Sequence, residues 1–71
     1  MATTQLLLSN PQGTRILTVK ANGGNVAVER MVEGTWVTID LFAQDGAWPL
    51  NLGRTATRFT PTGGAAFEIS K

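Results

Sequence analysis

Short clusters of turn-forming residues interrupt this chain about every 8 to 12 residues, and no apolar pattern of helical period persists between them. Every cluster contains Gly, and most combine it with Asn, Asp or Pro, which adopt the backbone angles of tight turns at low steric cost. β-branched and aromatic side chains fill the segments between clusters, as is typical of strands. The main clusters are Asn10-Pro11-Gln12-Gly13, Asn22-Gly23-Gly24-Asn25, Glu33-Gly34, Gln44-Asp45-Gly46 and Pro61-Thr62-Gly63-Gly64. This regular spacing of turns between strand-like segments predicts an all-β fold.

The segments between the turns predict roughly six or seven short strands in a single β domain that covers residues 1–71. The best-defined pair is the hairpin from Val26 to Phe42, with Glu33-Gly34 near its tip and Asn22 to Asn25 leading into it as another tight turn. Pro49 cannot donate a backbone hydrogen bond, so its strand is expected at a sheet edge. The predicted strands are residues 5–9, 14–21, 26–32, 35–42, 48–52, 55–60 and 65–70. We expect a small antiparallel β-sandwich or barrel, connected like a meander.

The strand at residues 35–42 is apolar on both of its faces apart from Thr38 and Asp40. Because side chains alternate along a strand, Val37, Ile39 and Leu41 are predicted to share one face and to lie toward the core. The whole predicted core is Leu17, Val19, Val26, Val28, Val37, Ile39, Leu50, Phe59, Phe67 and Ile69. The opposite face carries Trp36, Thr38, Asp40 and Phe42. Large aromatic side chains on one face are characteristic anchors of interfaces, so we predict that this face binds another chain.

The small size of the chain favours assembly. It has 71 residues and contains neither Cys nor His. A domain of this size buries only about 60% of its unfolded surface, so its stability is expected to be marginal. Disulfide bonds and zinc sites, which stabilise many small domains, need Cys or His. We expect a homo-oligomer or a complex with a larger protein.

The charge pattern argues against other classes of partner. Six basic and five acidic residues give a net charge of +1, and the basic residues are spread along the chain. Nucleic-acid-binding proteins usually concentrate positive charge in a patch, so no nucleic acid is expected. No apolar run is longer than that from Leu6 to Leu8, which is far shorter than the ~20 residues that span a bilayer, so no transmembrane segment and no membrane partner are expected. The first residues also lack the basic and apolar regions of a signal peptide.

The side chains available for chemistry are few. Nucleophilic catalysis usually pairs Ser, Cys or Thr with a base such as His, which is absent here. Glu29 and Asp40 are the carboxylates that the hairpin could bring together as general acid and base, but nothing places them in a pocket, and we predict solvated strand residues. Asp45-Gly46 is the only fragment of a calcium loop, and neither Gly-Gly pair is followed by the Lys of a phosphate-binding loop. We expect no catalytic residues, no metal and no cofactor.

One stretch of the sequence carries a family resemblance. Residues 25–40 read NVAVERMVEGTWVTID, and Phe42, Asp45-Gly46, Arg58-Phe59 and Gly63-Gly64-Ala65-Ala66-Phe67 follow. This order, which covers most of residues 14–69, resembles small β modules in the structural proteins of tailed bacteriophages. The resemblance implies a virion component assembled in the host cytoplasm, such as a decoration, head-tail joining or tail-associated protein.

Three functions follow as hypotheses. The leading one is a non-enzymatic structural protein that self-associates and docks on a larger virion protein through a sheet face. The alternative is a monomeric module that binds a ligand such as a glycan by stacking it on Trp36 or Trp48. The third is a phage-encoded inhibitor of a host protein. The mass of the protein in solution distinguishes the first two.

Overall fold

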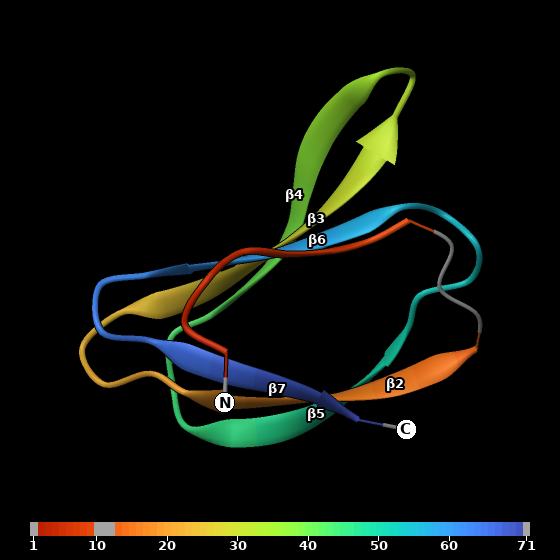
Figure 1. Cartoon of the computed structure of the whole chain (residues 1–71). Coiled ribbons are helices and arrows are strands. Elements are labelled where there is room, and N and C mark those ends of the chain that lie inside the picture. Colours follow the sequence, from red (N-terminus) through yellow and green to blue (C-terminus); the bar gives the residue numbers. More distant parts are fainter. Residues whose placement is uncertain (1, 10–12, 71) are drawn as a thin grey trace.

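The computed structural model describes residues 2–9 and 13–70, which form two antiparallel sheets packed face to face (Figure 1). One sheet has four strands in the order β1-β6-β3-β4, and the other has three in the order β5-β2-β7. The strands are β1 Leu6–Leu8, β2 Thr14–Lys20, β3 Asn25–Val32, β4 Thr35–Phe42, β5 Gly46–Asn51, β6 Thr57–Thr62 and β7 Ala66–Ser70. The all-β prediction is confirmed, and its form is a sandwich. In this part of the chain there is no helix with the length and apolarity to cross a membrane.

The predicted hairpin is confirmed as β3 and β4. The two strands pair from Val26 opposite Phe42 to Val32 opposite Thr35. Glu33 (φ 49°) and Gly34 (φ 79°) both have left-handed backbone angles, as a two-residue type I′ turn requires. This turn suits the natural twist of paired strands, so local chemistry alone defines the hairpin.

The connections between the other strands differ from the prediction. Within the described ranges, β3 and β4 are the only consecutive strands that lie in the same sheet. β2 pairs with β5 and β7, whereas β3 pairs with β4 and β6. The meander prediction is therefore wrong, because the turns after β2 and after β6 carry the chain from one sheet to the other. The turn predicted at Asn10-Pro11-Gln12-Gly13 lies mostly outside the described residues.

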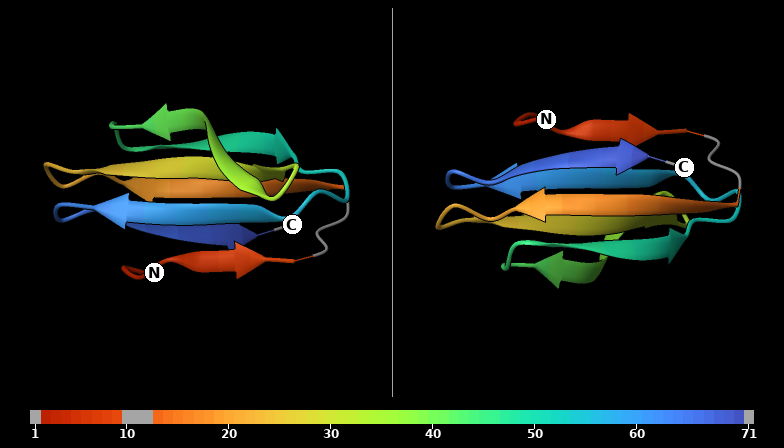
Figure 2. Two further views of the ribbon diagram at one scale, coloured as in Figure 1. Left: turned by 90° about the horizontal axis from the view of Figure 1, so that it is seen from above. Right: turned by 90° about the horizontal axis from the view of Figure 1, so that it is seen from below.

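These two sheet-to-sheet turns pack against each other at one end of the sandwich (Figures 1 and 2). The side-chain amide Nδ2 of Asn22 donates to the carbonyl oxygen of Gly64 at 3.4 Å. A Cβ atom at Gly24 would overlap the backbone carbonyl of Thr62, and one at Gly64 would lie 2.8 Å from the carbonyl oxygen of Asn22. Gly24 and Gly64 are thus required by the close approach of two backbones.

The core lies between the sheets and contains most of the predicted residues. Buried as predicted are Leu17, Val19, Val26, Val28, Phe59 and Phe67, with Leu50 and Ile69 partly buried against them. The rings of Phe59 and Phe67, one from each sheet, have centroids 5.8 Å apart. Leu52 and Thr57 are also fully buried, and the hydroxyl of Thr57 donates to the carbonyl oxygen of Thr55 at 3.0 Å. The only buried polar side chain among the described residues is therefore hydrogen-bonded.

Val37 and Ile39 were predicted in the core, and this prediction is wrong. They are 43% and 50% exposed. The outer half of the hairpin projects beyond the body of the sandwich, so no strand of the other sheet covers it (Figure 1). Arg30, in the middle of the hairpin, contacts the end of β5, where its Nη2 atom donates to the carbonyl oxygen of Asn51 at 2.9 Å. The projecting half therefore keeps its apolar side chains in solvent.

Replacing Ile39 by Ala is accordingly expected to lower the free energy of unfolding by only ~1 kcal/mol or less, because the site is half exposed and no cavity forms. A buried Ile would cost about 2 to 5 kcal/mol. Urea unfolding at low protein concentration measures the difference. Val28→Ala, on the buried face of the paired strand, is the control and should cost clearly more. Equal losses for the two variants would show that Ile39 is packed after all.

Candidate protein-interaction surface

A β-bulge divides the residues predicted to form one interface, Trp36, Thr38, Asp40 and Phe42. Val28 pairs with Asp40 and Glu29 with Thr38, which leaves Ile39 as an extra residue in β4. Trp36 and Thr38 consequently lie on the outer face, the side of the four-stranded sheet that is turned away from the other sheet. Asp40 and Phe42 lie on the inner side, opposite Val28 and Val26. The prediction that all four share a face is wrong, because the extra residue reverses the alternation.

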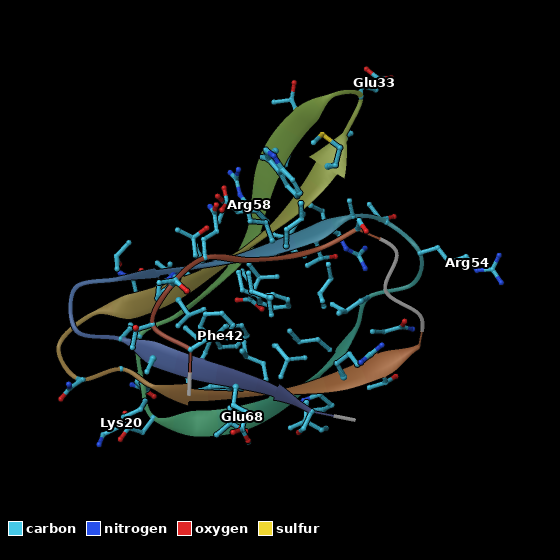
Figure 3. The ribbon with its side chains drawn as sticks, in the orientation of Figure 1. Lys20, Glu33, Phe42, Arg54, Arg58 and Glu68 are labelled. Atoms are coloured by element: carbon cyan, nitrogen blue, oxygen red, sulfur yellow. The ribbon has the colours of Figure 1, made fainter. Side chains whose placement is uncertain are left out.

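Phe42 is a core residue. It is 9% exposed, and its ring centroid lies 4.5 Å from that of Trp48 on β5. Figure 3 shows Phe42 between the two sheets. The turn before Trp48 is held in place by Asp45, whose Oδ1 atom accepts the backbone N–H of Ala21 at 2.8 Å. Phe42 therefore contacts its own chain and is unavailable to a partner.

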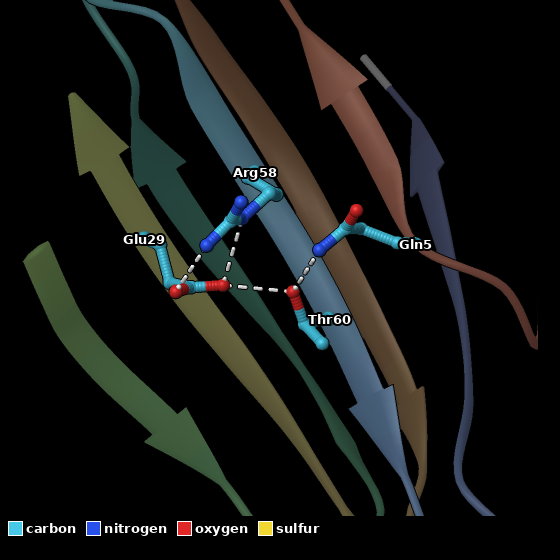
Figure 4. Close-up of polar contacts among 4 residues, drawn as sticks. All are labelled: Gln5, Glu29, Arg58 and Thr60. Carbon is cyan, nitrogen blue, oxygen red and sulfur yellow. Dashed lines mark hydrogen bonds and ion pairs between the residues drawn. The ribbon is translucent and has the colours of Figure 1, made fainter. Parts of the chain in front are cut away.

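The outer face has a polar network at its centre (Figure 4). The guanidinium of Arg58 on β6 donates two hydrogen bonds to the carboxylate of Glu29 on β3, at 3.1 and 2.8 Å. The hydroxyl of Thr60 donates to the same carboxylate at 2.7 Å, and the side-chain amide of Gln5 donates to Thr60 at 3.0 Å. Glu29, Arg58 and Thr60 alternate with buried residues along β3 and β6, which directs their side chains outward. The sequence analysis missed this network, because β3 and β6 are far apart in the chain and only their pairing joins Glu29 to Arg58.

The network favours the charged forms of its two ionisable groups. The hydrogen bonds from Arg58 and Thr60, together with the charge of Arg58, lower the pKa of Glu29 below 4.5. The hydrogen bond to Glu29 in turn raises the pKa of Arg58. The pair is therefore an ion pair at neutral pH and ties β3 to β6.

The low pKa of Glu29 predicts a pH dependence of stability. Because the folded-state pKa lies below the unfolded value of 4.5, the stabilisation is complete above that value and is lost as the pH falls through the folded-state pKa. Glu29→Gln should therefore be less stable than wild type at pH 7, and the difference should shrink below pH ~4. Thermal melts across this range test it, with Glu68→Gln on the exposed side of β7 as control. A Glu29→Gln deficit that persists unchanged in acid would contradict the ion-pair account.

Both Trp side chains make contacts within the chain. The guanidinium carbon of Arg58 lies 4.4 Å from the ring centroid of Trp36, a cation–π arrangement. Trp36 is half-buried on the outer face, next to the Glu29–Arg58 pair. Trp48 is half-buried against Phe42. Neither indole is a free platform, which removes the specific support for glycan stacking.

The largest exposed apolar side chains gather on the hairpin. We call this group the hairpin patch, and its members are Val32, Val37, Ile39 and Leu41. Leu41 is the most exposed member, with 55% of its surface accessible to solvent. Outside the patch, Leu7 on β1 is the only exposed large apolar residue in residues 2–9 and 13–70. Val32 and Val37 lie on the inner side of the hairpin, whereas Leu41, opposite Ala27, lies on its outer side, so the group follows the hairpin and its free edge rather than one face. Isolated exposed apolar residues are ordinary on soluble proteins, whereas a group of them is typical of interaction sites.

The hairpin patch lies on an open sheet edge. Of the four edge strands, β1 has only three residues, and β5 contains Pro49, as predicted. β7 is partly covered by Ala2, which exchanges backbone hydrogen bonds with Phe67 at 2.7 and 2.8 Å. β4 has eight residues, contains no Pro, Lys or Arg, and has one charged residue, Asp40. Short strands, Pro and a covering segment protect the other three edges, and the bulge and Asp40 protect the far part of β4. Residues 35–38 of β4 have none of these features, so this part of the edge is best suited to receive another strand.

Sites of other kinds are absent from the described part of the chain. Glu29 and Asp40 lie on opposite faces of the sheet, so they do not form a carboxylate pair. Residues 2–9 and 13–70 contain no group of three or more side chains arranged to hold a metal ion, and no pocket was found among them. The hairpin patch and the edge of β4 are therefore the features from which a function can be argued.

Comparisons with known proteins add no relative: no family model, curated protein or solved structure matches this chain.

Proposed function

We propose that this chain is a non-enzymatic assembly protein that binds other protein chains through the β3–β4 hairpin. The observation that carries the proposal is the hairpin patch, in which four large apolar side chains are exposed along one hairpin. Covering such side chains contributes roughly 25 cal/mol for each Å² removed from water. A stable monomer gains nothing from exposing them, whereas a subunit of an assembly does.

The surroundings of the patch support the same role. Trp36 and Thr38 lie beside it on the outer face, where an aromatic ring backed by the Glu29–Arg58 pair offers a rigid contact area. Rigid aromatic side chains lose little entropy on binding and are frequent anchors of interfaces. In this proposal Trp36 and Thr38 keep the interface role expected from the sequence, and Phe42 does not.

We further propose a virion as the setting, with the chain itself and a larger virion protein as its partners. The support is the resemblance of residues 14–69 to small β modules of tailed-phage structural proteins. Such modules act in many copies and need no catalytic groups.

The test compares wild type with the triple variant Val37→Thr, Ile39→Thr, Leu41→Thr. Thr retains the β-branched shape that strands favour, so the hairpin should persist while the apolar surface is lost. Light scattering over a concentration series should show a mass that increases with concentration for wild type and stays at one chain for the variant, with similar melting temperatures. Leu7→Thr, on the opposite edge of the sheet, is the control and should associate like wild type.

Two results would contradict the proposal. One is a wild-type chain that keeps the mass of a single copy at every concentration. The other is a triple variant that associates as strongly as wild type.

A further inference from the structure

We propose that two copies of this chain pair through their β4 edges, antiparallel about a two-fold axis near Val37, so that one sheet continues across both copies. This inference rests on the proposed function and specifies its partner as a second copy.

Trp36 and Thr38 direct their backbone groups toward the open edge. The N–H of Met31 donates to the carbonyl oxygen of Ala56 at 3.1 Å, on the side of β3 away from β4. Met31 is opposite Trp36 in the ladder, and residues of such a pair both direct their N–H and C=O groups outward. Thr38 is two residues further along and has the same orientation. Between Trp36 and Thr38 lies Val37, whose backbone N–H and C=O groups face β3 instead.

The edge beyond the bulge is less accessible. The Asp40 carboxylate accepts the backbone N–H of Leu41 at 2.9 Å. Bulges and inward-facing charges both discourage strand addition. The regular part of the edge, residues 35–38, is therefore where a partner strand fits.

An antiparallel copy of β4 complements this short edge. It offers the same two outward residues in reverse order, so that Trp36 of each copy faces Thr38 of the other and both pairs exchange backbone hydrogen bonds. Val37 then lies opposite its own copy, and Ile39 lies opposite Thr35. A two-fold interface of this kind needs only one surface patch, which must match itself.

The charges permit this pairing. In this register Asp40 lies opposite Gly34, so the two Asp40 carboxylates are about 20 Å apart along the strands, well beyond the ~8 Å screening length of physiological salt. The whole chain has a net charge of +1, so two copies repel each other weakly. A second copy therefore supplies hydrogen-bond partners for the backbone groups of the edge and apolar contacts for Val37, and its charges do not oppose the pairing.

Disulfide trapping tests the register, because the chain has no Cys of its own. Residues opposite each other in a non-hydrogen-bonded antiparallel pair have Cα atoms about 4.5 Å apart, within the range that a disulfide spans. Val37→Cys should form a covalent dimer under mild oxidation at concentrations where wild type associates. Leu7→Cys, at a somewhat more exposed position on β1, is the control and should cross-link at least tenfold more slowly.

A second variant tests the hydrogen bonds. Thr38→Pro removes an N–H that faces the open edge and leaves the bonds to β3 intact, so it should fold and remain a single chain in light scattering. Ile39→Lys, at an exposed position beside the two-fold axis, should also fold and remain a single chain, because it places a charge at the edge. This variant puts no constraint on the backbone.

The outcomes separate this inference from the proposed function. If wild type associates but Val37→Cys cross-links no faster than Leu7→Cys, or Ile39→Lys dimerises like wild type, edge pairing is overturned and the assembly role stands. If wild type never associates, the proposed function is contradicted as well.

Discussion

A Gly24→Ala variant is expected to lose at least about 3 kcal/mol of unfolding free energy and to melt more than about 12 °C below wild type. A Cβ atom at this position would overlap the carbonyl of Thr62 in the neighbouring sheet-to-sheet turn. The obstacle is backbone, so no side-chain rotation relieves it, and the turn between β6 and β7 would have to move. A domain of 71 residues has a total free energy of unfolding of only about 4 to 11 kcal/mol, which makes this loss severe. Thermal melts followed by circular dichroism measure it.

Gly53→Ala is the matched control. Gly53 has a left-handed φ of 58°, but a Cβ atom there would meet nothing within 4 Å. Its substitution should therefore cost only the backbone term of about 1 to 2 kcal/mol. Equal losses at the two positions would show that the contact between the two turns does not stabilise the fold.

Phe59→Ala is expected to cost about 3 to 5 kcal/mol, because it leaves a cavity between the two sheets. Phe59 is fully buried on β6 and packs against Phe67 from the opposite sheet. Its loss removes a contact that joins the two layers. Urea unfolding should show a lower midpoint with little change in slope.

Leu7→Ala on β1 is the control for this second prediction. Leu7 is exposed on the outer face of the same sheet, in the strand that pairs with β6. Its truncation should change stability by about 0.5 kcal/mol or less. A small loss for Phe59→Ala would mean that the sandwich does not depend on this core.

The sequence predicted local features well because their causes are local. The hairpin of β3 and β4 follows from the Glu33-Gly34 turn, whose left-handed angles suit this connection. Pro49 placed β5 at a sheet edge through its missing N–H. Both features depend on a few adjacent residues.

The pairing of distant strands could not be predicted in the same way. Asn22 (φ 51°) and Gly23 (φ 86°) have the same left-handed angles as the hairpin turn, yet they lead the chain into the other sheet. Turn chemistry does not distinguish a return along one sheet from a passage between two. For this reason the sequence predicted a meander and missed the contact between Glu29 and Arg58.

The candidate surface was predicted in part. The apolar character of residues 35–42 on both faces correctly indicated an unusual strand, but the bulge at Ile39 and the projection of the hairpin changed which side chains are exposed. Trp36 and Thr38 remain on the outer face, Phe42 belongs to the core, and the exposed set is Val37, Ile39 and Leu41. A bulge depends on the partner strand, so alternation along β4 alone could not reveal it.

The central claim is that the chain binds another chain at the edge of β4. Hydrogen exchange at this edge tests the claim most directly. The amides of Trp36 and Thr38 face the open edge, so they should exchange rapidly in dilute protein and slow at least tenfold at concentrations where the mass in solution has doubled. The amide of Val37, which faces β3, should be protected at both concentrations. If the mass doubles while Trp36 and Thr38 continue to exchange at the dilute rate, the edge of β4 is not the interface.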